Sequence, residues 1–319
     1  MKSSFSPLKS TRSAALTLGS FAALAHVAMA DPTTSYNTGS LGKLADGAST
    51  AGVVVDQPGA IAAYEDFSSN YAGGDRTEIP FLSELNPASG SPFTIEFWAK
   101  PTSSDDADAP VGNRLGGNVN RSGWVFFQRA SGWNFRMYNG NGTQNGWDIT
   151  GGPAPLNTWT HVVAVWSGTA ATLFVNGVDV TSPNAGPGGY NANTTEAFRV
   201  GALIGGDNGY NGGLDDVAFY PTALTPAQIT AHYTTASSSV SGAYSSLVLA
   251  DGAVLYLQQN PPSAKLEVTS LVPYATKVSF TGVLSQSEDL TTWTDLPAVT
   301  SPYTPPSPQP GKLFYRAHR

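Results

Sequence analysis

Two adjacent acidic residues are the first candidates for chemistry in this sequence. Asp215 and Asp216 lie in the segment YNGGLDDVAFYPTALTPAQITAHY (210–233), in a chain of which only 12% of the residues are charged. Paired carboxylates can cleave a glycosidic bond or bind a hard cation such as calcium. They can equally belong to the fold, because buried polar groups are commonly hydrogen-bonded without any further role.

The alternation of side chains along a strand separates these two aspartates. Neighbouring residues point to opposite faces, so Asp215 shares a face with Val217 and Phe219, and Asp216 shares the other. A glycosidase pair needs carboxyl groups that face each other roughly 5–10 Å apart, so we exclude it. The face with Val217 and Phe219 is the more apolar, which predicts that Asp215 points to the core and that Asp216 is a solvated surface acid.

A buried Asp215 carboxylate is costly unless it is hydrogen-bonded or bound to a cation. We expect it either to accept backbone N–H groups at the sheet margin or to ligate a metal. In the second alternative, Asp66 or Asp75 is its partner, and one structural Ca²⁺ joins the two ends of the domain. The sequence predicts no other cofactor.

Other catalytic signatures are missing from the sequence. No Gly-x-Ser-x-Gly elbow occurs, no cluster of histidines has zinc spacing, and the chain has no cysteine. We interpret His161, in TWTHVVAVW, as a hydrogen-bonded structural imidazole. Glu96, in TIEFW, has no second acid at an alternate position of its strand. No catalytic residue is therefore predicted.

Aromatic residues between 124 and 147 alternate with asparagine, glutamine and aspartate. Trp and Tyr rings offer flat surfaces to the C–H faces of sugars, and amides or carboxylates bind the hydroxyl groups. Tyr138 and Trp147 adjoin Gly/Asn turns, where exposure is expected. We therefore predict that they bind a neutral or weakly charged glycan together with Asn145 and Asp148. In the alternative, these aromatics fill the core, because Trp is highly buried on average.

The elements that must position these residues are mainly strands. FTIEFWAKP (93–101) alternates between two faces, and TWTHVVAVW (158–166) is apolar on both, as is typical of a central strand. TLFVNGVDV (172–180) contains Asn-Gly, the pair favoured in a two-residue hairpin turn. Abundant Gly (34) and Pro (23) agree with an all-β chain rich in turns.

One short helix is expected after the last of these strands. Thr225 can cap it, Pro226 occupies the first helical position, and Gln228 completes a capping box. We expect this helix to end near Tyr233.

The first thirty residues predict a secretory signal peptide. A basic start precedes an apolar run that ends in an A-x-A pattern at 28–30. The run is too short for a convincing membrane anchor, so we expect an extracellular or periplasmic protein with no membrane insertion after cleavage. Cleavage changes the net charge from −7 to −10 and leaves 13 basic residues. Nucleic acid is excluded as a partner, because phosphates need clustered Lys and Arg.

Three segments together resemble a known family. FTIEFWAKP, WTHVVAVWSGTAATLFVNGV and YNGGLDDVAFYPTALTPAQITAHY are similar, in order and spacing, to the strand signatures of laminin-G-like, concanavalin A-like jelly-roll domains of secreted bacterial proteins. The resemblance implies an all-β jelly-roll sandwich. That family includes glycan-binding, adhesion and enzyme-accessory modules, and some members hold calcium. The tail from Ser285 to Arg319 resembles the small C-terminal β-sandwich modules of large secreted bacterial proteins.

The sequence therefore predicts two β-domains. The segment TTASSSVSG (234–242) has the composition of a linker. The expected parts are a signal peptide (1–30), an N-terminal arm (31–50), the jelly roll (51–235), a linker (236–242) and a small C-terminal β-domain (243–319).

The leading functional hypothesis is a secreted, non-catalytic binding or adhesion protein whose jelly roll binds an extracellular glycan or another cell-surface component. Two alternatives stay open. One is a carbohydrate-active hydrolase or lyase with a dispersed site. The other is a purely structural extracellular component.

Overall fold

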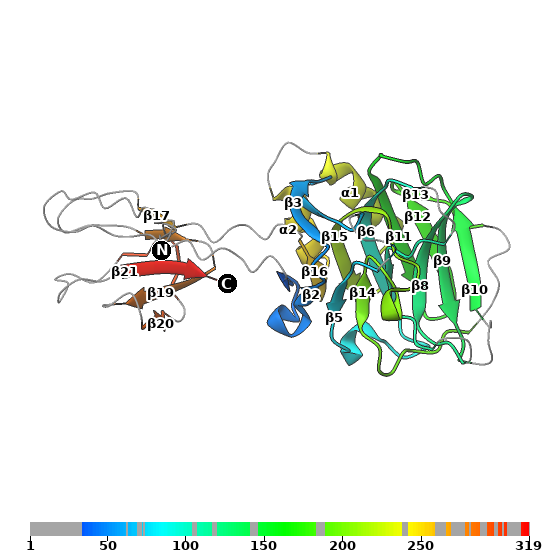
Figure 1. Cartoon of the computed structure of the whole chain (residues 1–319), viewed down its shortest axis with the longest axis horizontal. Helices are drawn as coiled ribbons and strands as arrows, with labels where there is room; N and C mark the ends of the chain where they lie inside the picture. Colours follow the sequence, from blue (N-terminus) through cyan, green and yellow to red (C-terminus); the bar gives the residue numbers. More distant parts are fainter. Residues whose placement is uncertain are drawn as a thin grey trace, which may run out of the picture. The chain divides into compact units, whose positions relative to one another are not determined.

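The computed structural model of the chain describes residues 34–61, 63–68, 72, 74–103, 107–116, 120–140, 146–182, 189–237, 242–258, 266–268, 278–280, 282–287, 292–296, 299–301, 303–304 and 314–318. The predicted signal peptide lies outside them. The chain divides into two compact units, one of residues 31–261 and one that contains residues 262–319 (Figure 1).

The larger unit is an antiparallel β-sandwich of two sheets. We call the first sheet A; its strands follow the order β1 (Thr34–Ser35), β2 (Gly47–Ser49), β5 (Thr77–Ile79), β14 (Phe198–Val200), β7 (Val111–Gly112), β8 (Trp124–Arg129), β9 (Gly132–Tyr138) and β10 (Gly146–Gly151). Sheet B follows the order β13 (Val178–Asp179), β12 (Ala171–Val175), β11 (Thr160–Trp166), β6 (Phe93–Pro101), β15 (Gly212–Tyr220), β4 (Ala63–Asp66) and β3 (Val54–Pro58), and β16 (Leu255–Leu257) pairs with β15. Neighbours distant in sequence, such as β6 and β15, give the jelly-roll crossovers, which confirms the predicted fold class.

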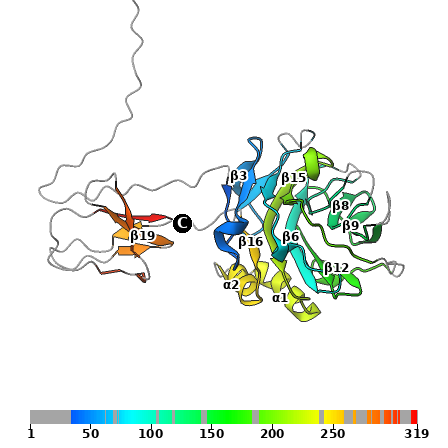
Figure 2. The same ribbon diagram turned by 90° about the horizontal axis from the view of Figure 1, so that it is seen from below.

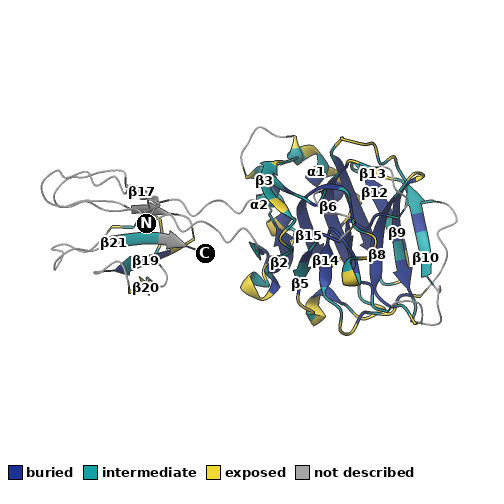
Figure 3. Ribbon diagram, viewed as in Figure 1, coloured by how far each residue is buried: buried dark blue, intermediate teal, exposed yellow. Residues whose placement is uncertain are grey.

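The core between the sheets follows from the period-two pattern of the strands. Alternate residues of β6 point into it, and on sheet A so do Trp124 and Phe126 of β8. Across the interface, the Phe97 and Phe126 rings pack edge to face with centroids 4.9 Å apart. Figure 3 shows buried residues along the strands of both sheets and exposed residues mainly in the turns.

Two helices cover part of the outer face of sheet B. Helix α1 (Pro226–Ala236) starts with the predicted capping box, in which the Thr225 hydroxyl accepts from Gln228 N and Gln228 Oε1 accepts from Thr225 N. Helix α2 (Ala243–Ala250) follows it. Both pack on a second apolar cluster that includes Trp98 and Tyr220. Figure 2 shows the two helices beside β16 and β6, on the side away from β8 and β9.

The predicted domain boundary is wrong. Helix α2 and β16 belong to the larger unit, because β16 extends sheet B and Tyr256 is fully buried there. The expected arm at 31–50 is also part of the sandwich, since β1 and β2 pair in sheet A. Asn37 joins the two ends of the unit: its Oδ1 accepts from Tyr256 N at 2.7 Å. The Ser/Thr-rich segment predicted as a linker begins inside α1, which runs to Ala236, and ends before α2. Composition alone does not distinguish such a segment from a linker between domains.

The smaller unit contains two small sheets. One pairs β17 (Leu266–Val268) with β18 (Val278–Phe280), and the other orders β20 (Thr294–Asp295), β19 (Val283–Ser287) and β21 (Phe314–His318). A second small β-unit is therefore present, as predicted. In the part of the chain that the structure describes, no helix combines the length and the apolar character needed to cross a bilayer.

Candidate functional site

A row of four residues crosses the outer face of sheet B beyond the helices. Lys100 of β6 lies opposite Gly213 of β15, and Gly213 lies opposite Asp66 of β4. Trp159 directly precedes β11 and continues the row beyond Lys100. The chain neighbours of these residues on β4, β6 and β15 point into the core between the sheets, so the row faces outward.

Two partly exposed aromatic rings stand on this row. The Tyr64 and Trp159 rings form an edge-to-face pair with centroids 5.0 Å apart and an interplanar angle of 77°. The Lys100 ammonium lies 5.8 Å from the tyrosine centroid and 5.9 Å from the tryptophan centroid. A Cβ at Gly213 would lie 2.4 Å from Tyr64 Cε2, so only glycine lets the tyrosine ring lie against the strand. The rings are thereby held in a fixed position on the sheet.

The polar groups of this site have few competing partners. Asp66 accepts from Ser68 N at 2.8 Å and from the Tyr64 hydroxyl at 3.4 Å. None of the ion pairs between described residues includes Lys100. Burial, followed by the nearby Asp66 charge, raises the pKa of Tyr64, so its hydroxyl stays protonated. We call the four side chains on this row, those of Tyr64, Asp66, Lys100 and Trp159, the aromatic row; Gly213 lies beneath the Tyr64 ring. It offers ring surface, an ammonium donor and a carboxylate acceptor, which suits binding, whereas a single carboxylate does not suit glycoside hydrolysis.

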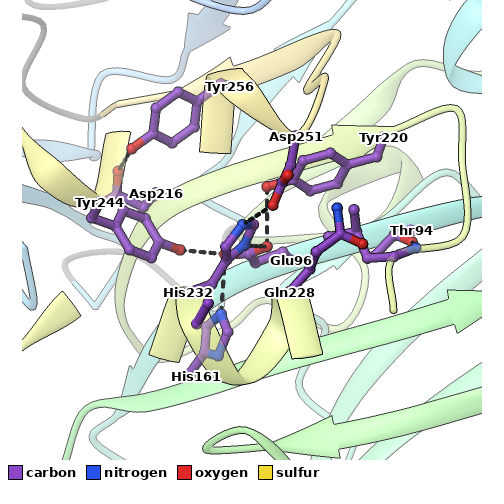
Figure 4. Close-up of polar contacts among 12 residues, drawn as sticks. Thr94, Glu96, His161, Asp216, Tyr220, Gln228, His232, Tyr244, Asp251 and Tyr256 are labelled. Atoms are coloured by element: carbon purple, nitrogen blue, oxygen red, sulfur yellow. Dashed lines mark hydrogen bonds and ion pairs between the residues drawn. The ribbon is translucent and has the colours of Figure 1, made fainter. Parts of the chain in front are cut away.

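A second polar cluster lies beneath the helices and is centred on Glu96 of β6 (Figure 4). This carboxylate is fully buried and contacts four side chains from four elements. On Oε1 it meets His161 Nε2 at 3.1 Å and accepts from the Tyr244 hydroxyl at 2.5 Å. On Oε2 it meets His232 Nδ1 at 2.7 Å and accepts from the Tyr220 hydroxyl at 3.1 Å. These contacts tie β11, β15, α1 and α2 to β6.

The charges of this cluster compensate one another. Burial alone would raise the pKa of Glu96, but hydrogen bonds from His161 and His232 outweigh it and hold the pKa well below its ordinary value. Burial alone would lower the pKa of His232, yet its hydrogen bonds to Glu96 and Asp251 leave it raised. Because Glu96 and both histidines are fully buried, the cluster positions the helices and offers no surface to a ligand. The structural interpretation of His161 is thus confirmed.

The structure corrects the predicted placement of the two aspartates. A β-bulge between Asp215 and Ala218 interrupts the alternation, and Asp216 adopts a φ of 51°. Both carboxyl groups therefore lie on the outer side of sheet B, and both are almost fully buried. Asp216 is not a solvated surface acid: it accepts from the Tyr256 hydroxyl. Asp215 accepts from Ala60 N at 2.9 Å and Ile61 N at 3.3 Å, as the structural alternative predicted.

Burial is the main cause of the shifted pKa values in this acidic pair. It raises the pKa of Asp215 well above its ordinary value, and the Asp216 charge adds to the effect. Burial also raises the pKa of Asp216 to about 7. At neutral pH the pair therefore retains a proton. The two aspartates do not lie on opposite faces of the strand, as the sequence predicted, but their near-complete burial still prevents contact with a substrate.

The predicted glycan contacts on sheet A meet a different environment. The Tyr138 side chain is only 1% exposed and packs with Val125, Phe127 and Leu203, so its ring is not a stacking surface. Proximity to a turn therefore did not bring exposure at this position. Trp147 is partly exposed but turns toward the core, with its ring centroid 5.9 Å from that of Trp166.

The polar residues of the same prediction have separate places. Asp148 forms an ion pair with Arg136, with 2.6 Å between Oδ2 and Nη2. Asn145 lies outside the described residues. Glycan binding by these four residues stays a prediction.

The three predicted metal ligands, Asp66, Asp75 and Asp215, each bind different protein groups and are not grouped around one point. Asp66 binds Ser68 N, Asp215 binds Ala60 and Ile61 N, and Asp75 accepts from the Thr50 hydroxyl at 3.0 Å. Among the described residues, no three His, Asp or Glu side chains are grouped closely enough to hold a metal ion. Calcium binding stays a prediction, and a lower melting temperature after addition of EDTA would support it.

Sequence reasoning missed the aromatic row. Its members come from positions 64, 66, 100 and 159, and only the register of β4, β15, β6 and β11 aligns them. The glycine at 213 was the available signal, because a glycine inside a strand often marks a close approach of another group.

Comparison with known proteins agrees with this fold. Residues 72–230 match the model of the concanavalin A-like lectin/glucanases superfamily. No curated protein matches the sequence. Among solved structures, the chain is similar to domain 4 of AbnA, an extracellular GH43 arabinanase from Geobacillus stearothermophilus, in complex with arabinotriose. The two share 18% sequence identity with a TM-score of 0.43, and the match covers 62% of this chain and 97% of the AbnA domain. It is also similar to a putative carbohydrate binding protein from Bacteroides ovatus, with 16% identity, a TM-score of 0.38, and coverage of 59% and 49%. The jelly roll of this chain is a domain of the concanavalin A-like lectin/glucanases superfamily.

Proposed function

We propose that the jelly roll is an extracellular or periplasmic glycan-binding module and that the aromatic row is its sugar-binding site. The observation that carries this proposal is the partly exposed Tyr64–Trp159 ring pair, fixed over Gly213 between a lysine and an aspartate. The predicted signal peptide supports the location outside the cytoplasm.

The chemistry of the row matches a sugar ring. The C–H face of a pyranose or furanose packs on an aromatic ring, while its hydroxyl groups need both donors and acceptors. Lys100 supplies donors and Asp66 supplies acceptors, each beside a ring. Binding sites commonly combine an apolar surface with a few placed polar groups.

A glycan array probed with the mature protein tests this proposal. We expect the protein to bind one class of oligosaccharide and Trp159→Ala to lower its affinity at least tenfold. Lys100→Gln should weaken binding less, because it removes one donor and leaves the rings in place. Circular dichroism and the melting temperature establish that each variant is folded.

Trp147→Ala is the matched control, since Trp147 is also a partly exposed tryptophan but lies on sheet A. If Trp147→Ala removes binding and Trp159→Ala keeps it, the site lies at the position predicted from sequence. A protein that binds no glycan on the array would overturn the proposal.

A further inference from the structure

The aromatic row borders the covered part of sheet B. Toward the middle of β6 the next outward position is Trp98, which is buried and stacks on Tyr233 of α1 with ring centroids 6.0 Å apart. On β15 the next outward position in this direction is Asp215, which is buried and accepts from the backbone N–H groups of residues 60 and 61. A ligand chain that starts on the aromatic row must therefore extend the other way, toward the end of β6.

A second row of outward-facing residues lies in that direction. Ser68, Asn211 and Thr102 each stand two positions farther along a chain segment that contributes to the first row. Thr102 N donates to Asn211 O at 2.8 Å, and Phe67 N donates to Gly212 O at 3.0 Å, so the pairing of the strands continues. Because alternate residues of a strand share a face, the three side chains point outward, about 7 Å beyond the aromatic row. We call Ser68, Asn211 and Thr102 the polar row.

The polar row is accessible. The Thr102 side chain is exposed, and those of Ser68 and Asn211 are partly exposed. The loop that carries Trp159 is held beside it, because Asn157 N donates to Pro101 O at 2.7 Å. A ligand that rests on the Trp159 ring can therefore reach the polar row without any movement of the helices.

Hydrogen bonds within the polar row orient the amide of Asn211. The Thr102 hydroxyl donates to Asn211 Oδ1 at 2.6 Å, and the Ser68 hydroxyl lies 3.4 Å from Thr102 Oγ1. With Oδ1 held by Thr102, the NH₂ group of Asn211 points away from it. In the described part of the chain this NH₂ group has no hydrogen-bond partner, so it offers two N–H donors. A donor that is already oriented loses little conformational freedom when it binds a ligand.

The chemistry of the two rows is different. The aromatic row offers ring surface and two charged groups, whereas the polar row offers only hydroxyl groups and an amide. Such neutral groups match the hydroxyl groups of an uncharged sugar and supply neither a counter-charge for an acid nor a stacking surface. The separation of about 7 Å along the strands is comparable to the length of one sugar residue. Neighbouring units of one chain can thus occupy the two rows.

We propose that the aromatic row and the polar row together bind a neutral oligosaccharide of at least two units. The first unit packs on the rings, and the second accepts hydrogen bonds from the NH₂ group of Asn211. The chain runs along β6 away from the helices. This inference rests on the proposed function and adds to it the class of ligand, its minimum length and its direction on the sheet.

Titration of the mature protein with sugars of increasing length, followed by NMR, tests this inference. The probes are glucose, cellobiose and cellotriose and the matching fragments of xylan, mannan and arabinan. We expect at least one of these series to bind, with an affinity at least tenfold higher for two units than for one. Asn211→Ala should lower this ratio of affinities at least threefold, because only the second unit reaches the amide.

Thr102→Val removes the hydroxyl group that orients Asn211, so it should lower the same ratio at least twofold. Thr169→Val is the matched control. Thr169 is also an exposed threonine, but it follows the end of β11 that lies opposite Phe93, at the other end of β6. This variant should keep the ratio of the parent. Melting temperatures establish that each variant is folded.

The results separate this inference from the proposed site itself. If Trp159→Ala weakens binding but the parent binds one and two units equally, the aromatic row is the site and the polar row has no part in it. An unchanged ratio in both Asn211→Ala and Thr102→Val would likewise overturn the inference. If Trp159→Ala leaves binding unchanged, or if the parent binds none of the four series, the proposed site and this inference are both wrong.

Discussion

His232 of α1 connects two carboxylates that belong to different parts of the fold. Its Nδ1 lies 2.7 Å from Glu96 Oε2, and its Nε2 lies 2.8 Å from Asp251 Oδ2. An imidazole with a carboxylate at each nitrogen donates from both, which requires the cationic form. This agrees with the raised pKa of His232. One side chain thus links α1, the central strand β6 and the turn after α2.

The first prediction concerns the carboxylate at the centre of this cluster. Glu96→Gln keeps the size of the side chain but replaces one acceptor oxygen by an NH₂ group, which cannot accept the hydrogen bonds that Glu96 receives. The His232 cation also loses its buried counter-charge. We expect the free energy of unfolding to fall by about 3–5 kcal/mol, the range for breaking a buried pair. Urea unfolding measures it. Glu84→Gln, at an exposed position, is the control and should change stability little. Equal stability of Glu96→Gln and the parent would show that the cluster does not hold the helices.

The second prediction is a loss of stability as the pH rises from about 5 to 8. Burial raises the pKa of Glu65 and of Asp216 from ordinary values of 4.5 and 3.8 to about 7. The folded chain therefore holds these protons more tightly than the unfolded chain. Their contribution is complete below the unfolded pKa values and is lost as the pH rises through about 7. His232, whose pKa is also raised, acts in the same direction.

Glu96 acts in the opposite direction, at lower pH. Its pKa is lowered, so its contribution is present above about 4.5 and is lost as the pH falls further. Melting temperatures at pH 5, 6.5 and 8 should therefore decrease in that order. Glu65→Gln should reduce the slope, because it removes one group whose proton must be released. A parent protein whose melting temperature rises over this range would contradict the assignment.

The parts of the fold that the sequence predicted correctly depend on local patterns. The period of two in 93–101 predicted a strand with two distinct faces, one of which, with Phe97, lies in the core, and the Thr225–Gln228 capping box located the start of α1. Asp215 was assigned to the wrong face because a bulge reverses the alternation, and no local residue pattern indicated that bulge.

The site was harder to predict, because its contacts join distant positions. Glu96 meets His232 across 136 positions and Tyr244 across 148. The two tyrosines on the outer faces illustrate the same limit. Tyr138 adjoins a turn but is buried, whereas Tyr64 lies within a strand but is partly exposed, with its ring against Gly213 of the neighbouring strand. Exposure therefore depends on the register between strands, which a single sequence does not specify.

The last prediction concerns where the larger unit ends. A truncated mature protein that ends at residue 261 keeps α2 and β16, so we expect it to fold and to melt cooperatively on its own. One that ends at residue 242, close to the boundary predicted from composition, loses Tyr256, which hydrogen-bonds Asp216, and Tyr244, which hydrogen-bonds Glu96. Both carboxyl groups are buried, and leaving such groups without partners costs about 1–3 kcal/mol each, and more where the group is charged. The lost pairing of β16 with β15 adds exposed strand edge and apolar surface. We therefore expect the shorter form to be unfolded or aggregated in circular dichroism and gel filtration. If both forms melt at the same temperature, α2 and β16 contribute nothing to the sandwich, and the boundary lies where composition placed it.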